Sequence, residues 1–188
     1  MAETTTAPHE SATALRNYYW LRAGVSIVWV LAAFVIGAGS PVIGGTLLVL
    51  YPAWDAIANA RDAQANGGFR ANAPQALNVW ISSIVTVAVA ATLLIDLHLV
   101  FGVIGAWAIL SGLLQLIAGV RRWREYGAQW AMVLSGAQSM LAGGFFIYRA
   151  TGDEALSAAT LAPYAAFGAF YFLLSATALT LKGRRRRS

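Results

Sequence analysis

The sequence contains no cysteine and few charged side chains, and each shortage excludes a class of function. Without cysteine there is no disulfide, no thiolate nucleophile and no cysteine-ligated metal centre. Charged residues make up 11% of the 188 residues and hydrophobic residues 59%, whereas a soluble domain carries about a quarter charged residues. Such a chain cannot cover a water-facing surface, so the composition indicates a membrane protein, and its length suits one compact bundle.

Motifs for catalysis and for cofactor binding are also missing. The sequence has no glycine-rich phosphate loop, no His-Glu-x-x-His motif and no plausible Ser/His/Asp set. The two histidines, His9 and His98, are predicted on opposite sides of the membrane. We therefore expect no enzyme activity, no catalytic residue, no cofactor and no bound metal.

What the sequence does contain is a series of apolar stretches, each close to the 20 or so residues that cross a bilayer core of about 30 Å. They are residues 18–37, 41–60, 77–95, 99–119, 128–148 and 158–181. Long apolar runs without strict alternation favour helices over barrel strands. We predict an all-α bundle of six transmembrane helices, with a disordered cytoplasmic tail over residues 1–17 and a basic tail over 182–188.

The distribution of positive charge predicts the orientation. If the N-terminus is cytoplasmic, all 13 Lys and Arg residues except Arg149 fall on the cytoplasmic side. Positive residues collect in cytoplasmic loops, so both ends are predicted inside, in a bacterial inner membrane. We interpret the run from Lys182 to Arg187 as a topology signal that also contacts anionic lipid heads, rather than as a nucleic-acid site.

Short links and an internal repeat predict three consecutive two-helix hairpins. Residues 37–41 have a turn composition between the first two spans, and only three residues separate the third and fourth. A shift of 60 residues places Gly45 over Gly105 and Arg61 over Arg121. Because two spans separate equivalent helices, all three units have the same orientation, unlike the inverted repeats of many transporters.

Two phrases carry a family resemblance. Tyr-Pro-Ala-Trp-Asp-Ala-Ile-Ala-Asn over residues 51–59, and Gly-Ala-Trp-Ala-Ile-Leu-Ser-Gly-Leu-Leu-Gln-Leu over residues 105–116, resemble the HdeD-like short-repeat membrane proteins. The resemblance covers most of residues 18–182. The resemblance implies a bacterial membrane protein with six spans. Most members of the family have no assigned activity, and its namesake is linked to acid resistance. The resemblance supplies no catalytic residue.

Arg22 and Asp55 are the main candidates for a functional site. Each lies about one helical turn inside the cytoplasmic end of its span, and intramembrane charges are costly unless they are paired or face water. One interpretation is a structural ion pair that joins two helices, and the other is a cytoplasmic vestibule or proton site. Gln115, Gln138 and Ser111 are neutral polar groups inside spans; they either bond between helices or, with Arg22 and Asp55, line a polar path.

Asp96 and His98 share a tight external turn. Histidine titrates near pH 6.5, so the turn is a candidate for a response to external acid. The other interpretation is that these residues cap the turn, since Asp is a preferred N-cap residue. One histidine with one carboxylate is a weak metal signal, because zinc sites usually use three or four protein ligands.

Small residues predict where helices approach closely. They recur along the fourth and fifth spans at Gly105, Gly112 and Gly119 and at Ser135, Ser139 and Gly143, and such stripes let another helix pack tightly. The partner is a helix of the same chain, a second copy or another membrane protein. We expect a non-enzymatic inner-membrane protein, and the alternative is a small channel or transporter for a proton, an ion or a small solute.

Overall fold

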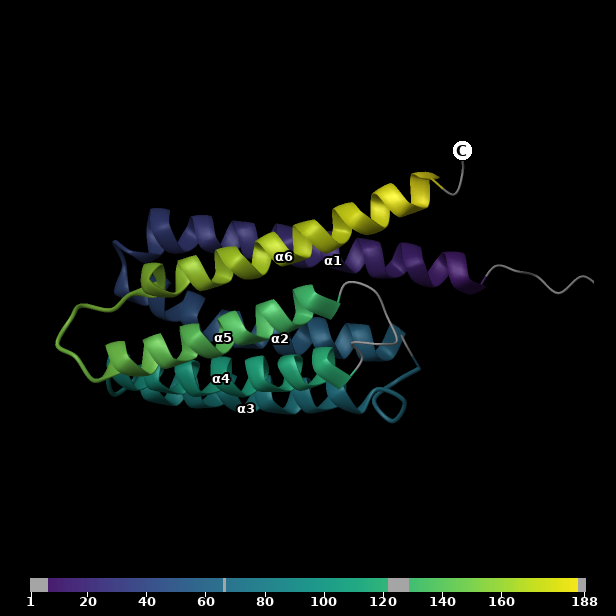
Figure 1. Cartoon of the computed structure of the whole chain (residues 1–188). Helices are drawn as coiled ribbons and strands as arrows, with labels where there is room; N and C mark the ends of the chain where they lie inside the picture. Colours follow the sequence, from purple (N-terminus) through teal and green to yellow (C-terminus); the bar gives the residue numbers. More distant parts are fainter. Residues whose placement is uncertain (1–6, 66, 122–128, 186–188) are drawn as a thin grey trace, which may run out of the picture.

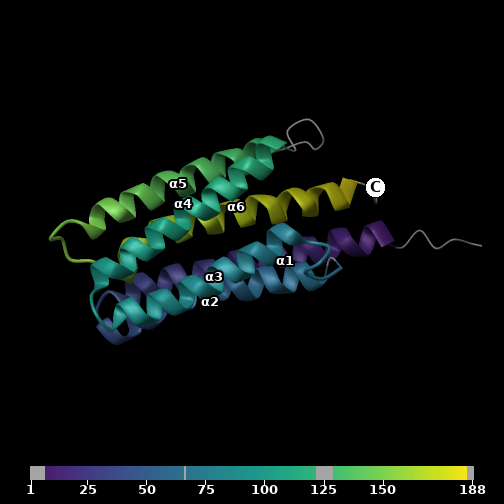
Figure 2. The same ribbon diagram turned by 90° about the horizontal axis from the view of Figure 1, so that it is seen from below.

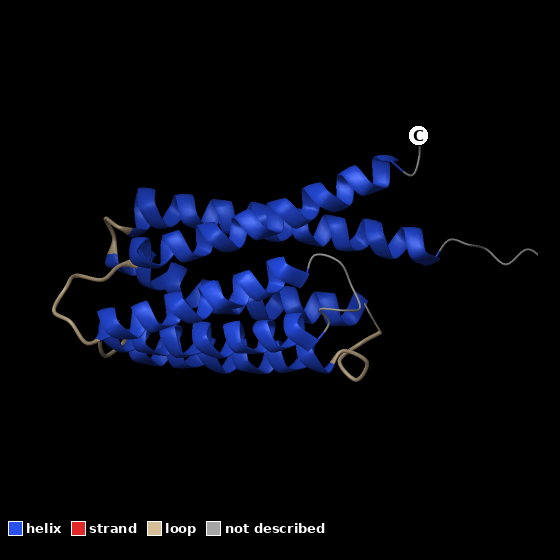
Figure 3. Cartoon of the chain, viewed as in Figure 1, coloured by secondary structure: helices blue, strands red, loops and turns tan. Residues whose placement is uncertain are grey.

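The computed structural model describes residues 7–65, 67–121 and 129–185. Seven helical segments run in the order α1 (Ala7–Ala32), the π-helical segment η1 (Ala33–Gly37), α2 (Pro41–Ala65), α3 (Ala73–Leu93), α4 (Leu97–Arg121), α5 (Gln129–Ala150) and α6 (Ala158–Arg185). The described residues contain helices and loops without a strand (Figure 3). In lipid a helix pairs its own backbone polar groups, which is why apolar runs of this length fold this way.

Helix ends differ from the predicted spans at both termini. The first helix begins at Ala7, so the prediction of a disordered tail is wrong for residues 7–17. This segment is rich in alanine, the best helix former, and Pro8 lies in the first turn, where its missing N–H costs nothing. The last helix continues through Lys182 to Arg185, into the predicted basic tail. Residues 1–6, 128 and 186–188 of the predicted segments lie outside the described residues.

The closest helix pairs are not the predicted hairpins. Helix α4 packs most extensively on α5, α1 on α6 and α2 on α3, and α3 also packs on α4. Figures 1 and 2 show α1 and α6 side by side along one side of the layer formed by α2 to α5. Helices α1 and α2 are joined by a tight turn, yet they touch little beyond η1. A short link between two helices therefore does not make them the closest packing partners.

Glycines allow the close approach of α4 and α5. A Cβ atom built on Gly105 would lie 2.7 Å from the Gly143 carbonyl oxygen, and one on Gly112 would lie 2.6 Å from that of Gly136. The two backbones thus approach closely at two levels, two helical turns apart. Ser139 adds a hydrogen bond of 3.0 Å to the Ala108 carbonyl oxygen. The predicted packing partner of this stripe is therefore a helix of the same chain; the surroundings of Gly119 lie outside what the structure describes.

Large apolar side chains fill the centre and also cover the outside. Fully buried residues include Leu48, Val89, Phe101, Ile104 and Leu161. Many other large apolar side chains are exposed on the helix surfaces, as expected where lipid replaces water. In the described part of the chain five helical stretches are long and apolar enough to cross a membrane: Thr13–Gly37, Pro41–Ala65, Ala73–Leu93, Leu97–Ile117 and Ala158–Gly183. Helix α5, which adjoins the undescribed residues 122–128, is not among them.

Two adjacent glycines test the α4–α5 contact. A Cβ added at Gly143 would lie 2.5 Å from the Gly105 carbonyl oxygen, whereas one added at Gly144 would meet no atom within 4 Å. Gly143→Ala should therefore destabilise the protein by about 1–3 kcal/mol, the usual cost of overpacking. Gly144→Ala should be neutral or slightly stabilising, because alanine is the better helix former. Reversible unfolding of both variants in detergent measures the difference, and equal stabilities would contradict the packing.

Candidate functional site

The charged pair predicted from the sequence is formed. The Nη2 group of Arg22 on α1 donates a hydrogen bond to Oδ1 of Asp55 on α2. The Arg22 side chain is 13% exposed and the Asp55 side chain 22% exposed, so both charges are largely removed from solvent. A charge in such surroundings is costly unless it has a partner, and this ion pair provides one for each.

The second carboxylate oxygen of Asp55 is also occupied. Oδ2 accepts hydrogen bonds from Nδ2 of Asn59 at 3.0 Å and from Oγ of Ser82 on α3 at 2.9 Å. Asn59 lies four residues after Asp55, which places both on one face of α2. Its Nδ2 group also donates to the Asp55 carbonyl oxygen at 2.8 Å. The carboxylate therefore joins three helices.

Ser82 extends this network to a fourth helix. Its side chain is buried, and its Oγ accepts a hydrogen bond of 3.3 Å from Nε1 of Trp107 on α4. A serine hydroxyl can donate one bond and accept others, so the direction of both bonds fits its chemistry. Arg22, Asp55, Asn59, Ser82 and Trp107 are called the Asp55 network below.

Arg22 also contacts α6. Its guanidinium carbon lies 4.4 Å from the centre of the Phe172 ring, and Nη1 donates to the hydroxyl oxygen of Tyr18 at 3.0 Å. A guanidinium over an aromatic face is attracted by about 0.5–2 kcal/mol, more when water is excluded. Arg22 therefore connects the α1–α6 pair to the layer that holds Asp55.

Aromatic rings fill the bundle next to the network. The Tyr51 ring centre lies 4.9 Å from that of Trp29, 5.8 Å from that of Trp107 and 6.3 Å from that of Tyr164. These rings come from helices α1, α2, α4 and α6. Tilted and edge-to-face pairs at such distances are favourable beyond their apolar burial. Aromatic rings therefore pack the α1–α6 pair against α2 and α4.

A serine-to-aromatic contact recurs with one spacing. Ser82 on α3 and Trp107 on α4 are 25 residues apart and hydrogen bonded. Ser139 on α5 and Tyr164 on α6 are also 25 residues apart, with their oxygens separated by 2.8 Å. Ser26 on α1 is buried as well, and Tyr51 on α2 follows it by the same interval. Sequence reasoning named Ser139 only as a small packing residue and missed Ser26 and Ser82, although the equal spacing of serine and aromatic residues was available to find them.

Two of the other polar groups predicted inside the spans, Gln115 and Gln138, bond to neighbouring helices. Nε2 of Gln115 donates to Oγ of Ser135 at 3.2 Å, between α4 and α5. Oε1 of Gln138 accepts from the Tyr171 hydroxyl at 2.9 Å, between α5 and α6. Ser111 is half-buried on α4. These bonds tie neighbouring helices together, and their partners differ from those of Arg22 and Asp55.

The turn between α3 and α4 is capped by Asp96. Its Oδ1 accepts the backbone N–H of His98 at 2.7 Å and lies 3.0 Å from Nδ1 of the same residue. These bonds, the backbone one foremost, lower the pKa of the Asp96 carboxyl below its usual value. At the same end Arg149 pairs with Glu154 at 2.7 Å. No cluster of three potential metal ligands occurs among the described residues.

Comparison with protein-family models, with curated proteins and with solved structures found no match for this chain. What the fold and the network define is a class: an all-helical membrane protein with a charged cluster held between its helices.

Two neighbouring serines test the network. Ser82→Ala would leave the Trp107 N–H without its acceptor and would remove one donor from the Asp55 carboxylate. Leaving such groups unpaired should cost about 1–3 kcal/mol in unfolding free energy. Ser83→Ala is the control, because Ser83 is next along α3 and its hydroxyl has no hydrogen bond to another described residue. Tryptophan fluorescence during unfolding in detergent measures both, and equal losses would contradict the network.

The turn at Asp96 predicts a pH dependence. Because the folded pKa of this carboxyl lies below the unfolded value, its stabilisation is complete above the unfolded pKa of about 4 and is lost as the pH falls through the folded pKa. Asp96→Ala should therefore lower the thermal midpoint at pH 6, and the difference from the unmodified protein should vanish at strongly acidic pH. Asp153→Ala, an exposed carboxylate in another loop, serves as control; a difference that grows on acidification would contradict the assignment.

Proposed function

We propose that this chain is a non-enzymatic protein of a bacterial inner membrane, with six spans and both ends in the cytoplasm. The role proposed for the Asp55 network is to hold the helices in one arrangement. The observation that carries this proposal is the complete pairing of the Asp55 carboxylate: Arg22 occupies one oxygen, and Asn59 and Ser82 occupy the other. A carboxylate with this many partners is suited to fixing geometry.

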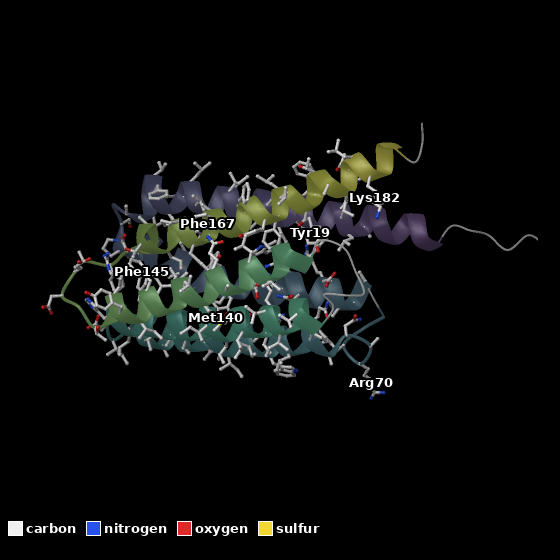
Figure 4. The ribbon with its side chains drawn as sticks, in the orientation of Figure 1. Tyr19, Arg70, Met140, Phe145, Phe167 and Lys182 are labelled. Carbon is white, nitrogen blue, oxygen red and sulfur yellow. The ribbon has the colours of Figure 1, made fainter. Side chains whose placement is uncertain are left out.

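Charge at the two ends of the bundle supports the orientation. Arg61, Arg70 and Lys182 are exposed at one end, which Figure 4 marks with Arg70 and Lys182. The opposite end carries Asp96 and Glu154. Since positive residues collect on the cytoplasmic side, the first end is assigned to the cytoplasm. Helix α5 counts as the sixth span because it runs antiparallel to α4 along the glycine contact.

The recurring serine and aromatic pairs support a threefold repeat of two-helix units. Ser26, Ser82 and Ser139 lie on α1, α3 and α5, and an aromatic residue follows each by 25 positions on the next helix. This register places Trp107 over Tyr51, a shift of 56 residues rather than the 60 that aligns Gly45 with Gly105. The two registers differ by about one helical turn, so both keep the same face of the helix aligned.

A role in the stress response of the envelope is proposed from the family resemblance alone. Within that proposal the protein acts through helix contacts with lipid, with a second copy or with another membrane protein. The exposed apolar side chains around the bundle are compatible with each of these neighbours.

Transport of a proton, an ion or a small solute is the second candidate. The observation in its favour is that Asp55 keeps 22% of its side-chain surface exposed, so solvent has partial access to an intramembrane carboxylate. Proteoliposomes that contain the unmodified protein and the Asp55→Asn variant separate the two candidates. Under the structural proposal neither preparation carries a proton or cation flux above that of empty liposomes. A flux that Asp55→Asn abolishes, while the fold is retained, would favour transport instead.

A double-mutant cycle tests the structural role directly. Asp55→Asn leaves Arg22 without its counter-ion and should lower the unfolding free energy by about 2–3 kcal/mol, because bonds to charged groups are the stronger ones. Arg22→Gln combined with Asp55→Asn should recover at least about 1 kcal/mol of the summed single losses. The control cycle uses Arg70→Gln and Asp153→Asn, two exposed residues on different loops, and should show no coupling. Purely additive losses at Arg22 and Asp55 would refute the proposal.

A further inference from the structure

The N-terminal part of α1 and the C-terminal part of α6 project together beyond the other helices. Figures 1 and 2 show both helix ends reaching past α2 to α5 at the same end of the bundle. Helix α6 has 28 residues, which corresponds to about 42 Å at 1.5 Å per residue. A bilayer core is about 30 Å thick. The projecting ends therefore extend into the layer of lipid headgroups.

The two projecting ends belong to one packed helix pair, and together they are called the projecting surface below. Helix α1 packs extensively on α6, and the Tyr19 and Phe172 rings stack with their centres 6.2 Å apart near the base of the projection. Phe172 also lies against the Arg22 guanidinium, so the base is fixed to the Asp55 network. The surface is thus positioned by the fold, although its tip lies beyond the other helices.

Positive charge dominates this surface. Its described cations are Arg16 on α1 and Lys182, Arg184 and Arg185 on α6; Lys182 is exposed, and Figure 4 places it on the projecting part of α6. In the sequence, residues 176–185 contain Lys182, Arg184 and Arg185 without an acidic residue, and residues 7–17 contain Arg16 and one acidic residue, Glu10. The net charge of the described projection is therefore positive.

Exposed apolar side chains accompany the cations. Trp20, one helical turn after Arg16 on α1, is 45% exposed, and Leu181, which precedes Lys182 on α6, is 54% exposed. Tryptophan at the end of a span is typical of the depth at which lipid headgroups meet the acyl chains. Helix ends that carry both cations and exposed apolar groups match the phosphates and the upper acyl chains of the surrounding lipid.

We propose that the projecting ends of α1 and α6, which carry Arg16, Trp20, Leu181 and Lys182, bind the headgroups of anionic phospholipids in preference to zwitterionic ones. Each Lys or Arg near an anionic membrane surface contributes about 1 kcal/mol of attraction. A polyanion in the cytoplasm would use the cations but leave Trp20 and Leu181 without apolar contact. The lipid surface uses both kinds of side chain. This inference does not depend on the role of the Asp55 network.

Lipid titration of the full-length protein in detergent tests the proposal. Phosphatidylglycerol should raise the thermal midpoint, and native mass spectrometry should show it retained, at lower concentration than phosphatidylcholine. Arg16→Gln combined with Lys182→Gln should weaken the apparent phosphatidylglycerol affinity about tenfold or more. It should leave phosphatidylcholine binding unchanged. Lys182 is exposed, and the hydrogen bond that the Arg16 side chain makes is an exposed one to the neighbouring Asn17, so the variant should retain its midpoint without lipid.

Arg70→Gln is the matched control, because it removes an exposed cation at the same end of the bundle but from the loop between α2 and α3. It should keep the lipid preference of the unmodified protein. Equal binding of the two lipids would overturn the proposal. An equal loss in Arg70→Gln would overturn it too, because the attraction would then come from the general charge of this end.

Discussion

A carboxylate between apolar helices imposes the strictest condition on this structure. Asp55 must have partners wherever the helices place it, because an unpaired charge at this depth costs several kcal/mol. The fold meets the condition with three side chains from three helices: Arg22 from α1, Asn59 from α2 and Ser82 from α3. The arrangement of α1, α2 and α3 therefore depends on the pairing of the Asp55 carboxylate. Arg22 adds α6 through the Phe172 ring, and Ser82 adds α4 through Trp107.

The helices associate through two kinds of contact: close backbone packing, and hydrogen bonds with aromatic contacts between longer side chains. The α4–α5 contact depends on glycine, because its backbones are too close for any side chain at Gly105 or Gly112. Hydrophobic burial gives no preference between helix and lipid neighbours, so close contact and hydrogen bonds must decide which helices associate. The α1–α6 pair meets the other helices differently, through large aromatic rings around Tyr51 and through the Asp55 network. Helix pairs that touch closely and pairs that meet through long side chains coexist in one protein.

The sequence was sufficient to predict where the apolar helices lie, although not where the first one begins, and the reason is physical. Apolar runs long enough to span a bilayer have few folding options, and the Arg22–Asp55 pair follows from the cost of isolated charge. The small-residue stripes of α4 and α5 were also predicted, because small residues let helices approach closely. The sequence did not show that the two stripes pack on each other. The helix starting at Ala7 was missed because its polar composition outweighed its alanine content and Pro8 in the prediction.

The remaining partners depend on tertiary contacts that local patterns do not report. Pairing of α1 with α6 joins opposite ends of the chain, and Ser82 becomes a ligand of Asp55 only after α2 and α3 have packed. The proposed repeat would have been easier to find from the 25-residue interval between serine and aromatic residues than from glycine alignment. The glycines of α4 are required for its contact with α5, whereas the serine and aromatic pairs join successive helices of the proposed unit.

The central claim is that Arg22 and Asp55 are in direct contact inside the membrane, and solid-state NMR in lipid bilayers measures it most directly. With nitrogen-labelled arginine and carbon-labelled aspartate, the account predicts dipolar coupling between the Arg22 guanidinium nitrogens and the Asp55 carboxyl carbon at hydrogen-bonding distance. The signal should disappear in Asp55→Asn, which assigns it. The absence of this coupling in the folded, reconstituted protein would contradict the account.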